Sequence, residues 1–388
     1  MRSDVVVIGA GPVGLVAGRV AADSGLAVEI VERRRPDDAP SCCTGLVSRA
    51  TLSVLGASNA SVLRTIRAIR LVLPSGRSIE LRARSEKAVV LDRVVLERDL
   101  RRQAENAGAQ LHFGNEAMSA SSGTVRIRSA NGDRTIHPAI IIGADGPGSQ
   151  VASWFSLEPA RLFVSAAQAN VAARAPCEDQ VDLFIGESVA PGFFGWAVPA
   201  EPGVVRVGVG VTSPHAPVPY LDRLLNERFS GARVLARTAG RIPLERAPHP
   251  ATDGLLLVGD AAGHVKPLSG GGLYVGGSCA RIAGELAVQA IRDPAPREPL
   301  PSRYLQRCTE AVGRELAFGT TIRHYLSRLR DADVEKLADA IDDPRLLGFL
   351  ADHADIDAFH QLPDHLSSDS RMWAAVLRLV PLFGPHLS

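Results

Sequence analysis

An α/β fold organised around a buried parallel sheet is predicted by three places where an apolar run of residues ends at a glycine turn. The runs cover residues 5–8, 139–142 and 255–258, and the turns begin at Gly9, Gly143 and Gly259. Uninterrupted apolar runs of this length are typical of strands that helices cover on both faces. A helix rich in small residues is expected after the first turn and another after the third. Strands and helices therefore alternate as they do in doubly wound proteins.

The first turn, at residues 9–14, reads G-A-G-P-V-G and lies between a strand and a helix. In a dinucleotide-binding fingerprint, Gly9 permits the tight turn, Gly11 lets a pyrophosphate approach the backbone, and Gly14 lets helix and strand pack closely. The helix N-terminus adds N–H donors and positive potential. Glu32, at the end of the second strand, is placed to accept hydrogen bonds from ribose hydroxyls. This unit predicts a bound dinucleotide without distinguishing NAD from FAD.

The rest of the chain divides by the pattern of its apolar residues. A hairpin is indicated near residues 69–90, where alternating residues flank a Pro-Ser-Gly turn, and a helix is expected over 93–108. Short alternating strands without a nucleotide motif continue from 161 to 242. We predict a discontinuous Rossmann-like domain over 1–160 and 243–295 that carries the hairpin as a small insertion, a mostly antiparallel substrate domain over 161–242, and a C-terminal helical region over 296–388.

The composition narrows the class of protein. Hydrophobic residues make up 46% of the 388 residues and charged residues 22%, as in ordinary globular chains. The 43 basic and 42 acidic residues nearly cancel, so no overall field attracts nucleic acid, and no nucleic-acid partner is expected. Five cysteines indicate reduced thiols and not a disulfide framework. We expect a cytoplasmic protein, with peripheral membrane contact left open.

A downstream turn that contains an aspartate distinguishes FAD from NAD. Gly259-Asp260-Ala261-Ala262 brings a carboxylate to a turn far downstream of the fingerprint, outside a simple NAD domain. Here the sequence resembles the para-hydroxybenzoate hydroxylase-like flavoproteins, in which such a Gly-Asp turn binds the ribityl chain and pyrophosphate of FAD. The turn Gly143 to Gly146, with Asp145, is also typical of that superfamily. The resemblance implies a non-covalently bound FAD.

Further motifs make the resemblance narrower. Gly270, Gly271 and Gly272 precede a helix that begins at Leu273, and Cys43-Thr44-Gly45-Leu46 follows the second strand. Over about residues 4 to 290 the chain is similar to the geranylgeranyl reductase family, flavoenzymes that saturate isoprenoid double bonds. The predicted FAD-binding residues are Gly9, Gly11, Pro12, Gly14, Glu32, Arg33, Cys43, Thr44, Gly45, Arg93, Asp145, Gly146, Gly259, Asp260, Gly270, Gly271, Gly272 and Leu273.

The resemblance also implies a hydrophobic, prenylated substrate. Phe194-Gly195-Trp196-Ala197-Val198-Pro199 is a relaxed form of the family's Tyr-x-Trp-x-Phe-Pro motif, with Phe194 replacing the tyrosine and Val198 the phenylalanine. Lys266 stands where the family often has asparagine. A prenyl chain needs apolar walls, and the predicted substrate residues are Phe193, Phe194, Trp196 and Pro199.

Alkene reduction by a reduced flavin requires a hydride at one carbon and a proton at the other. The candidates for the proton source are Cys43, His264 and a flavin-bound water, in that order. Aside from Cys43, the cysteines at 42, 177, 279 and 308 have no metal-ligand spacing, so no metal is expected. Electrons are expected from NAD(P)H or from a protein carrier.

Two other functions stay open. A flavin monooxygenase or halogenase of an aromatic or carrier-bound substrate belongs to the same superfamily, although Gly263 replaces the hydroxylase-type histidine and only Lys266 lies near the flavin turn. A prenyl-binding escort protein without flavin is the non-enzymatic alternative, against which the retained Glu32 and Asp260 argue. The apolar tail at 373–383 is expected to pack on the protein or to touch a membrane.

Overall fold

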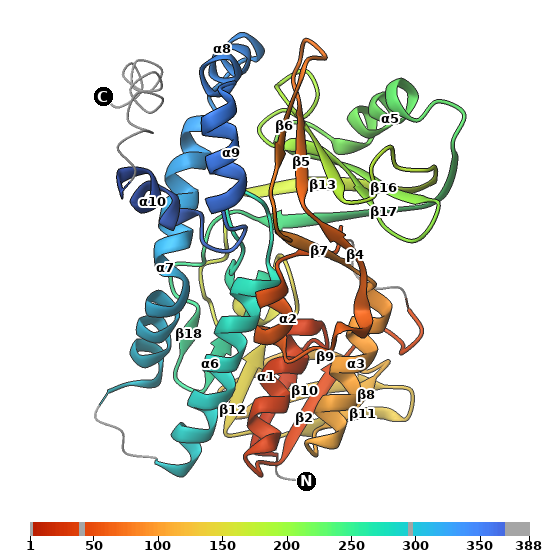
Figure 1. Ribbon diagram of the computed structural model, residues 1–388. Coiled ribbons are helices and arrows are strands. Elements are labelled where there is room, and N and C mark those ends of the chain that lie inside the picture. Colours follow the sequence, from red (N-terminus) through yellow and green to blue (C-terminus); the bar gives the residue numbers. More distant parts are fainter. Residues whose placement is uncertain (1–2, 39–42, 294–297, 369–388) are drawn as a thin grey trace.

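The computed structural model describes residues 3–38, 43–293 and 298–368 and consists of two sheet-containing parts (Figure 1). The lower part in Figure 1 holds a six-stranded sheet of order β18-β19-β12-β1-β2-β8, in which β18 alone runs antiparallel to its neighbour. Its strands are β1 (Val5–Ile8), β2 (Val28–Glu32), β8 (Gln110–Phe113), β12 (Ile140–Gly143), β18 (Ala251–Thr252) and β19 (Leu255–Leu257). The predicted α/β class and parallel sheet are confirmed.

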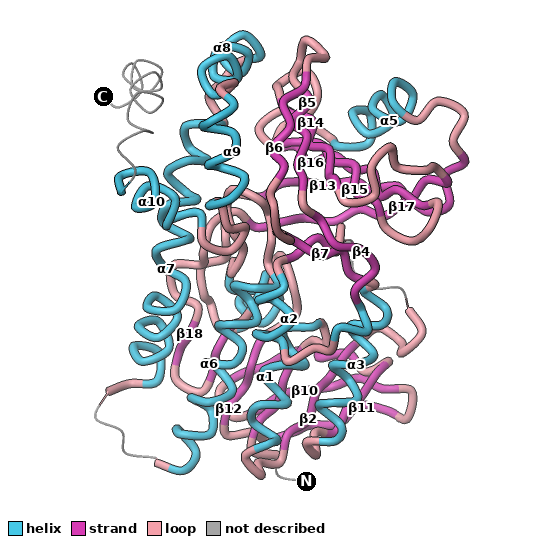
Figure 2. Tube along the Cα trace, viewed as in Figure 1, coloured by secondary structure: helices cyan, strands magenta, loops and turns pink. Residues whose placement is uncertain are grey.

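Both faces of this sheet are covered, as its uninterrupted apolar strands require. Val5 and Val7 of β1 pack into the core shared with the helices, whereas Val6 and Ile8 pack against a three-stranded sheet on the opposite face. Figure 2 shows the helices in front of the strands. The covering elements are α1 (Pro12–Asp23), α3 (Arg93–Asn106) and α6 (Leu273–Arg292) on one side, and β9 (Glu116–Ser121), β10 (Thr124–Ser129), β11 (Gly132–Ile136) and α4 (Gln150–Trp154) on the other.

The upper part is a seven-stranded sheet of order β17-β13-β16-β15-β14-β5-β6 (Figure 2). Its strands are β5 (Ala68–Val72), β6 (Ser78–Arg82), β13 (Phe163–Ala172), β14 (Gln180–Ile185), β15 (Phe194–Pro199), β16 (Val204–Thr212) and β17 (Arg233–Pro243), and α5 (Pro217–Arg228) packs on one face. The expected hairpin exists as β5 and β6, but β5 pairs in parallel with β14. The hairpin therefore extends the substrate sheet and is not a separate appendage of the first domain.

A fourth, small sheet and a helix connect the two parts. They comprise β3 (Leu46–Val47), α2 (Arg49–Leu55), β4 (Val62–Ile66) and β7 (Ala88–Leu91), in strand order β3-β7-β4. Val47 and Leu91 pack into the helix-side core of the lower part, while Ile66 and Val90 pack with the upper sheet. Side chains of this small sheet thus belong to both cores.

The C-terminal helices run along the side of both parts (Figure 1). They are α7 (Leu300–Leu326), α8 (Asp331–Ile341), α9 (Pro344–His353) and α10 (Leu362–Ser368). Near the tip of the β5–β6 hairpin, Ala338 packs with Leu73 and Ile79. Within the described ranges no helix is long and apolar enough to cross a membrane. The apolar tail at 373–383 lies outside the described residues.

The turn between β1 and α1 shows why glycine is needed at two of its positions. Gly9 has a φ of +107°, and a Cβ there would lie 2.2 Å from the carbonyl oxygen of Ala144 in the turn after β12. A Cβ on Gly14 would lie 2.0 Å from the carbonyl oxygen of Gly9. Gly11, in contrast, has an ordinary extended backbone with a φ of −68°, and a Cβ there would meet nothing within 4 Å.

This difference predicts opposite effects of two alanine substitutions on the flavin-free protein. Gly14→Ala is expected to lower the free energy of unfolding by roughly 1–3 kcal/mol, because the added methyl group overlaps backbone that cannot move aside. Gly11→Ala is the matched control and is expected to change it by less than about 0.5 kcal/mol. Urea denaturation of the two apoproteins measures both values. Equal losses in the two variants would contradict this account of the turn.

Candidate functional site

The predicted motifs meet at one edge of the six-stranded sheet. Parallel strands end at a common edge, and ligands of doubly wound proteins bind in the crevice beyond those ends. The turn after β1 begins there, Glu32 ends β2, Asp145 follows β12, and Asp260 follows β19. Segments that lie far apart in the chain are thereby brought to one place.

The N-terminus of α1 is open toward this edge. Gly11 precedes the helix, and no side chain caps the first turn. No acidic residue lies in that turn, so its free N–H groups and positive potential are uncompensated by the protein. The space that a Cβ on Gly11 would enter is empty. The turn therefore has the donors and the clearance that a pyrophosphate requires.

Glu32 is buried at the end of β2, with 7% of its surface exposed. One carboxylate oxygen accepts a hydrogen bond from the backbone N–H of Ala10 at 2.9 Å, and the other accepts one from the N–H of Arg34 at 2.9 Å. The Arg34 side chain also donates to it. The Arg33 side chain is exposed. Glu32 thus holds the glycine turn in place and retains acceptor capacity for a sugar hydroxyl.

Asp145 has a local role that its motif alone did not reveal. One of its carboxylate oxygens accepts from the Ser149 hydroxyl at 2.6 Å, and the other accepts from the backbone N–H groups of Gln150 and Val151. These bonds stabilise the N-terminus of α4. The adjacent Gly146, with a φ of +85°, has nothing within 4 Å of where a Cβ would lie. It is therefore the backbone at Gly146, more than the Asp145 carboxylate, that is left free for a ligand.

Asp260 lies in the short 3-10 helix η2 (Gly259–Ala262), where Gly272 packs so closely that a Cβ would come within 3.1 Å of its Oδ1. Burial raises the pKa of Asp260 to about 6, against the opposing attraction of Arg93. Such a carboxylate lacks donors that would stabilise its charge. A ligand with several hydroxyl groups would supply them.

Arg93 begins α3 beside Asp260 and is almost fully buried. Its Nη2 donates to Glu97 at 2.7 Å, while its buried Nε has no partner among the described residues. Burial opposes its charge, but attraction to Cys43 and Glu97 outweighs it and raises the pKa of Arg93. The free Nε of Arg93 could donate to a phosphate oxygen of FAD, and the neighbouring Asp260 carboxylate could accept from its ribityl hydroxyl groups.

Cys43, Thr44 and Gly45 form a loop beside Arg93, with Cys43 partly exposed. The guanidinium of Arg206, a buried residue of β16, donates to the carbonyl oxygens of Thr44 at 2.8 Å and Leu91 at 3.0 Å. A Cβ on Gly45 would meet both Arg206 and Leu91 at 2.7 Å. Arg206 therefore attaches the cysteine loop to the upper sheet. Nothing in the sequence around Arg206 indicated this role.

The glycine turn before α6 rests on a buried ion pair. Lys266 donates to Asp357 Oδ1 and to the Ile356 carbonyl oxygen, each at 2.6 Å, and both charged side chains are 6% exposed. Asp357 also accepts hydrogen bonds from Ser48 and from Thr51. A Cβ on Gly271 would lie 2.9 Å from Lys266 Cε. The C-terminal region thereby holds both the glycine turn and the start of α2.

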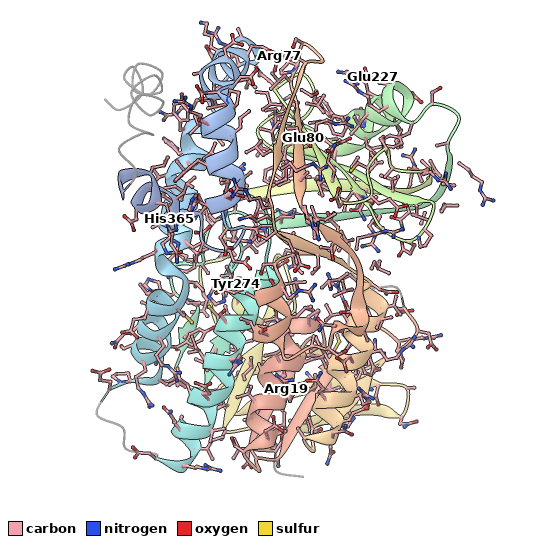
Figure 3. The ribbon with its side chains drawn as sticks, viewed as in Figure 1. Arg19, Arg77, Glu80, Glu227, Tyr274 and His365 are labelled. Atoms are coloured by element: carbon pink, nitrogen blue, oxygen red, sulfur yellow. The ribbon has the colours of Figure 1, made fainter. Side chains whose placement is uncertain are left out.

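Tyr274, the second residue of α6, marks this junction in Figure 3, where the lower and upper parts meet. Burial raises its pKa, with a further contribution from Asp357. The role of Asp357 could not be predicted from the sequence. It lies 91 residues after Lys266, and nothing in the C-terminal region signals a contact with a loop so far away in the chain.

The predicted substrate residues separate into two groups. Phe193 and Phe194 are partly exposed and stacked, with ring centroids 4.2 Å apart. Phe193 lies against Gly270 and under the guanidinium of Arg323. Trp196 is 7% exposed and donates to Gln168, and Pro199 is also buried. The first pair forms an apolar surface next to the glycine turn, whereas the second belongs to the core of the upper part.

His264 lies in a different environment from Cys43. Its side chain is 0% exposed, so it is closed off from solvent. Burial lowers its pKa to about 3, aided by Arg246, and the ring is therefore neutral at pH 7. This burial argues against His264 as the proton donor, whereas Cys43 is partly exposed.

Three comparisons with known proteins agree with this geometry. Residues 2–213 match the family described as "FAD binding domain". The chain is 31% identical to a digeranylgeranylglycerophospholipid reductase of Methanothrix thermoacetophila, over 88% of this chain and 92% of that protein. It is 32% identical to digeranylgeranylglycerophospholipid reductase 2 of Methanothermobacter thermautotrophicus, over 87% of this chain and 91% of that protein.

Solved structures share the fold over nearly the whole chain. A geranylgeranyl bacteriochlorophyll reductase-like protein of Thermoplasma acidophilum superimposes with a TM-score of 0.84 at 23% identity, covering 98% of this chain and 99% of that one. A p-nitrophenol 4-monooxygenase of Pseudomonas putida superimposes with a TM-score of 0.71 at 17% identity, covering 95% and 97%. With the family match over more than half of its length, the chain is an FAD-dependent oxidoreductase that belongs to the FAD-binding-domain family and, within it, to the geranylgeranyl reductase family.

Proposed function

We propose that the protein reduces carbon–carbon double bonds in the prenyl chains of a lipid, with digeranylgeranylglycerophospholipid as the first substrate to test. The observation that carries this proposal is the apolar surface of Phe193 and Phe194 directly beside the glycine turn at Gly270. Leu183 and Ile242 pack with the same cluster and extend it. Relatives named for that lipid are similar to this chain over about nine-tenths of its length.

The proposed FAD contacts follow from the groups left unsatisfied at the sheet edge. The open N-terminus of α1 at Gly11 would hold the pyrophosphate, and Glu32 would accept from the adenosine ribose. Arg93 and Asp260 would bind the ribityl chain and its adjoining phosphate. The backbone of Gly270, Gly271 and Gly272 would face the pyrimidine edge of the flavin. When bound, reduced FAD supplies the hydride for alkene reduction.

Cys43 is the protein group proposed to protonate the second alkene carbon. It is partly exposed, and the loop that carries it is fixed by Arg206 on one side and Arg93 on the other. Phe194, which replaces a tyrosine of the family motif, has no hydroxyl that could take this role. The electron donor is proposed to be NAD(P)H or a protein carrier, and the protein to act in the cytoplasm, at a membrane surface where its lipid substrate resides.

The competing functions are less well supported. A halogenase would need a free lysine close to the flavin, and the Lys266 ammonium is already bound to Asp357 and to a carbonyl oxygen. The resemblance to a monooxygenase structure at 17% identity concerns the fold alone. An escort protein without flavin would have no use for a partly buried pair such as Asp260, whose pKa is raised, and Arg93, whose Nε lacks a partner.

The test of the proposed function is a single-turnover experiment. The flavoprotein is reduced with dithionite under anaerobic conditions and mixed with digeranylgeranylglycerophospholipid in micelles. Flavin reoxidation is expected, with a product mass that rises by two hydrogens for each double bond reduced. Cys43→Ala is expected to slow this step by about 10²–10⁴-fold while flavin content stays unchanged. Cys177→Ala, which changes a cysteine of the upper part, is the control. Flavin that is reoxidised by added oxygen but not by this lipid would reject digeranylgeranylglycerophospholipid as the substrate.

A second prediction concerns the pyrophosphate site. Gly11→Ala is expected to weaken FAD binding by tenfold or more, equivalent to about 1.4 kcal/mol, because its methyl group enters the space that the pyrophosphate would occupy. Titration of the apoprotein with FAD, followed by flavin fluorescence, gives the dissociation constants. Gly348→Ala, in α9, is a control whose Cβ also meets nothing within 4 Å. An unchanged FAD affinity in Gly11→Ala would place the pyrophosphate elsewhere.

A third prediction follows from the raised pKa of Asp260. In the apoprotein the folded chain keeps a proton on Asp260 at pH values where the unfolded chain has released it, since the pKa is about 6 when folded and 3.8 ordinarily. The contribution of Asp260 to the free energy of unfolding is therefore most favourable below about pH 4 and is lost as the pH rises to 6. Denaturant titrations over this range should show a steeper decline for the wild-type apoprotein than for Asp260→Asn. Parallel curves would refute the assignment.

A further inference from the structure

A cluster of soft donors is buried next to the turn that carries Asp260. His264 follows η2, Cys279 lies in α6 and Cys308 lies in α7. Their nitrogen and sulfur atoms all lie within 4.8 Å of one another. The side chains are 0%, 0% and 2% exposed. The three residues are distant in the chain, so the absence of ligand spacing in the sequence did not exclude this arrangement.

His264 supplies an independent sign that something is missing from the cluster. Neither of its ring nitrogens has a hydrogen-bond partner among the described residues, although the side chain is completely buried. A buried polar atom without a partner costs about 1–3 kcal/mol. The hydroxyl of the neighbouring Tyr304 donates to the Leu257 carbonyl oxygen at 2.7 Å and makes no hydrogen bond with the ring. An imidazole nitrogen without a hydrogen bond therefore lies within 4.8 Å of two sulfur atoms.

We propose that His264, Cys279 and Cys308 form a binding site for one thiophilic divalent cation, of which Zn²⁺ is the representative. Imidazole nitrogen and cysteine sulfur are the ligands that Zn²⁺ prefers. Two thiolates balance the charge of the cation, so the loaded cluster is neutral and avoids the cost of an isolated buried charge. The bond to the metal also gives the imidazole nitrogen the partner that it lacks.

The position of the cluster indicates a structural role for the ion. His264 ends the turn that begins at Gly259 and carries Asp260, while Cys279 and Cys308 lie on two helices that pack together. A cation there would tie the turn to α6 and α7 at one point. Because His264 is sealed from the crevice, the ion would take no part in the redox chemistry. This inference does not depend on the identity of the substrate.

The experiment measures zinc binding to the full-length chain. Protein purified under reducing conditions is stripped with a chelator, given one equivalent of Zn²⁺, and dialysed against a weak competitor. Elemental analysis and native mass spectrometry are expected to find one Zn²⁺ per wild-type chain and per chain of the control Cys177→Ser, whose cysteine lies in the upper part. Cys279→Ser and Cys308→Ser are expected to lose affinity for Zn²⁺ by at least about 100-fold, because changing even an outer-shell partner of a metal ligand typically costs 10–100-fold.

A measurement on the wild-type chain alone guards against variants that fail to fold. Crystals grown with Zn²⁺ should show an anomalous scattering peak between His264 and the two sulfur atoms, and Zn²⁺ should raise the melting temperature of the wild type but not of Cys308→Ser. The proposal is overturned if the wild type binds no Zn²⁺, if binding is the same in Cys279→Ser and Cys308→Ser, or if the anomalous peak lies elsewhere. A Cys279–Cys308 disulfide in protein purified under reducing conditions would overturn it too.

Discussion

The close approach of two backbone turns is the constraint on which the rest of the site depends. The turn after β1 comes so near to the turn after β12 that only a glycine with positive φ fits at Gly9, and α1 can pack on its strand only because Gly14 has no side chain. With those contacts made, the first N–H groups of α1, the end of β2 and the turn after β19 face a common space. Glu32 secures the arrangement by accepting from Ala10. A binding site for a dinucleotide is thus a consequence of packing geometry before any ligand is present.

Long-range polar contacts then position loops that the sheet itself does not hold. Arg206 reaches from the upper sheet to the carbonyl oxygens of the cysteine loop, and Lys266 joins the glycine turn to Asp357 near the C-terminus. Both basic groups are buried, so each would be costly without its partners. Such contacts stabilise a particular relative placement of segments more than they stabilise the chain as a whole. They make the crevice a joint product of the lower part, the upper part and the C-terminal helices.

The sequence allowed the sheet, the glycine turns and the flavin class to be predicted because each depends on local pattern. An apolar run followed by glycines signals a strand and its turn wherever it occurs, and Glu32 and Asp260 follow such runs directly. The hairpin was also recognisable, but its pairing with β14 was not, because strand partners are chosen by tertiary contacts. Arg206, Asp357 and the neighbours of His264 were missed for the same reason. The role of Asp145 was missed for another reason. Its hydrogen bonds to the start of α4 are local, but an acidic residue four or five positions before a short helix is only a weak sign of a helix cap.

Two sets of incompletely satisfied groups mark two different sites. Arg93 and Asp260 lie side by side at the crevice, one with a spare donor and the other with a carboxylate whose pKa is raised by burial, and a polyhydroxylated cofactor answers both needs. His264 lies only a few residues from Asp260 but is sealed off, with two sulfur atoms as its nearest reactive neighbours. FAD bound at the crevice would not give that imidazole a hydrogen-bond partner, because the buried ring is out of its reach. The proposed cation is small enough to enter the core and positive enough to be held by two thiolates, so it would supply the partner that the imidazole lacks.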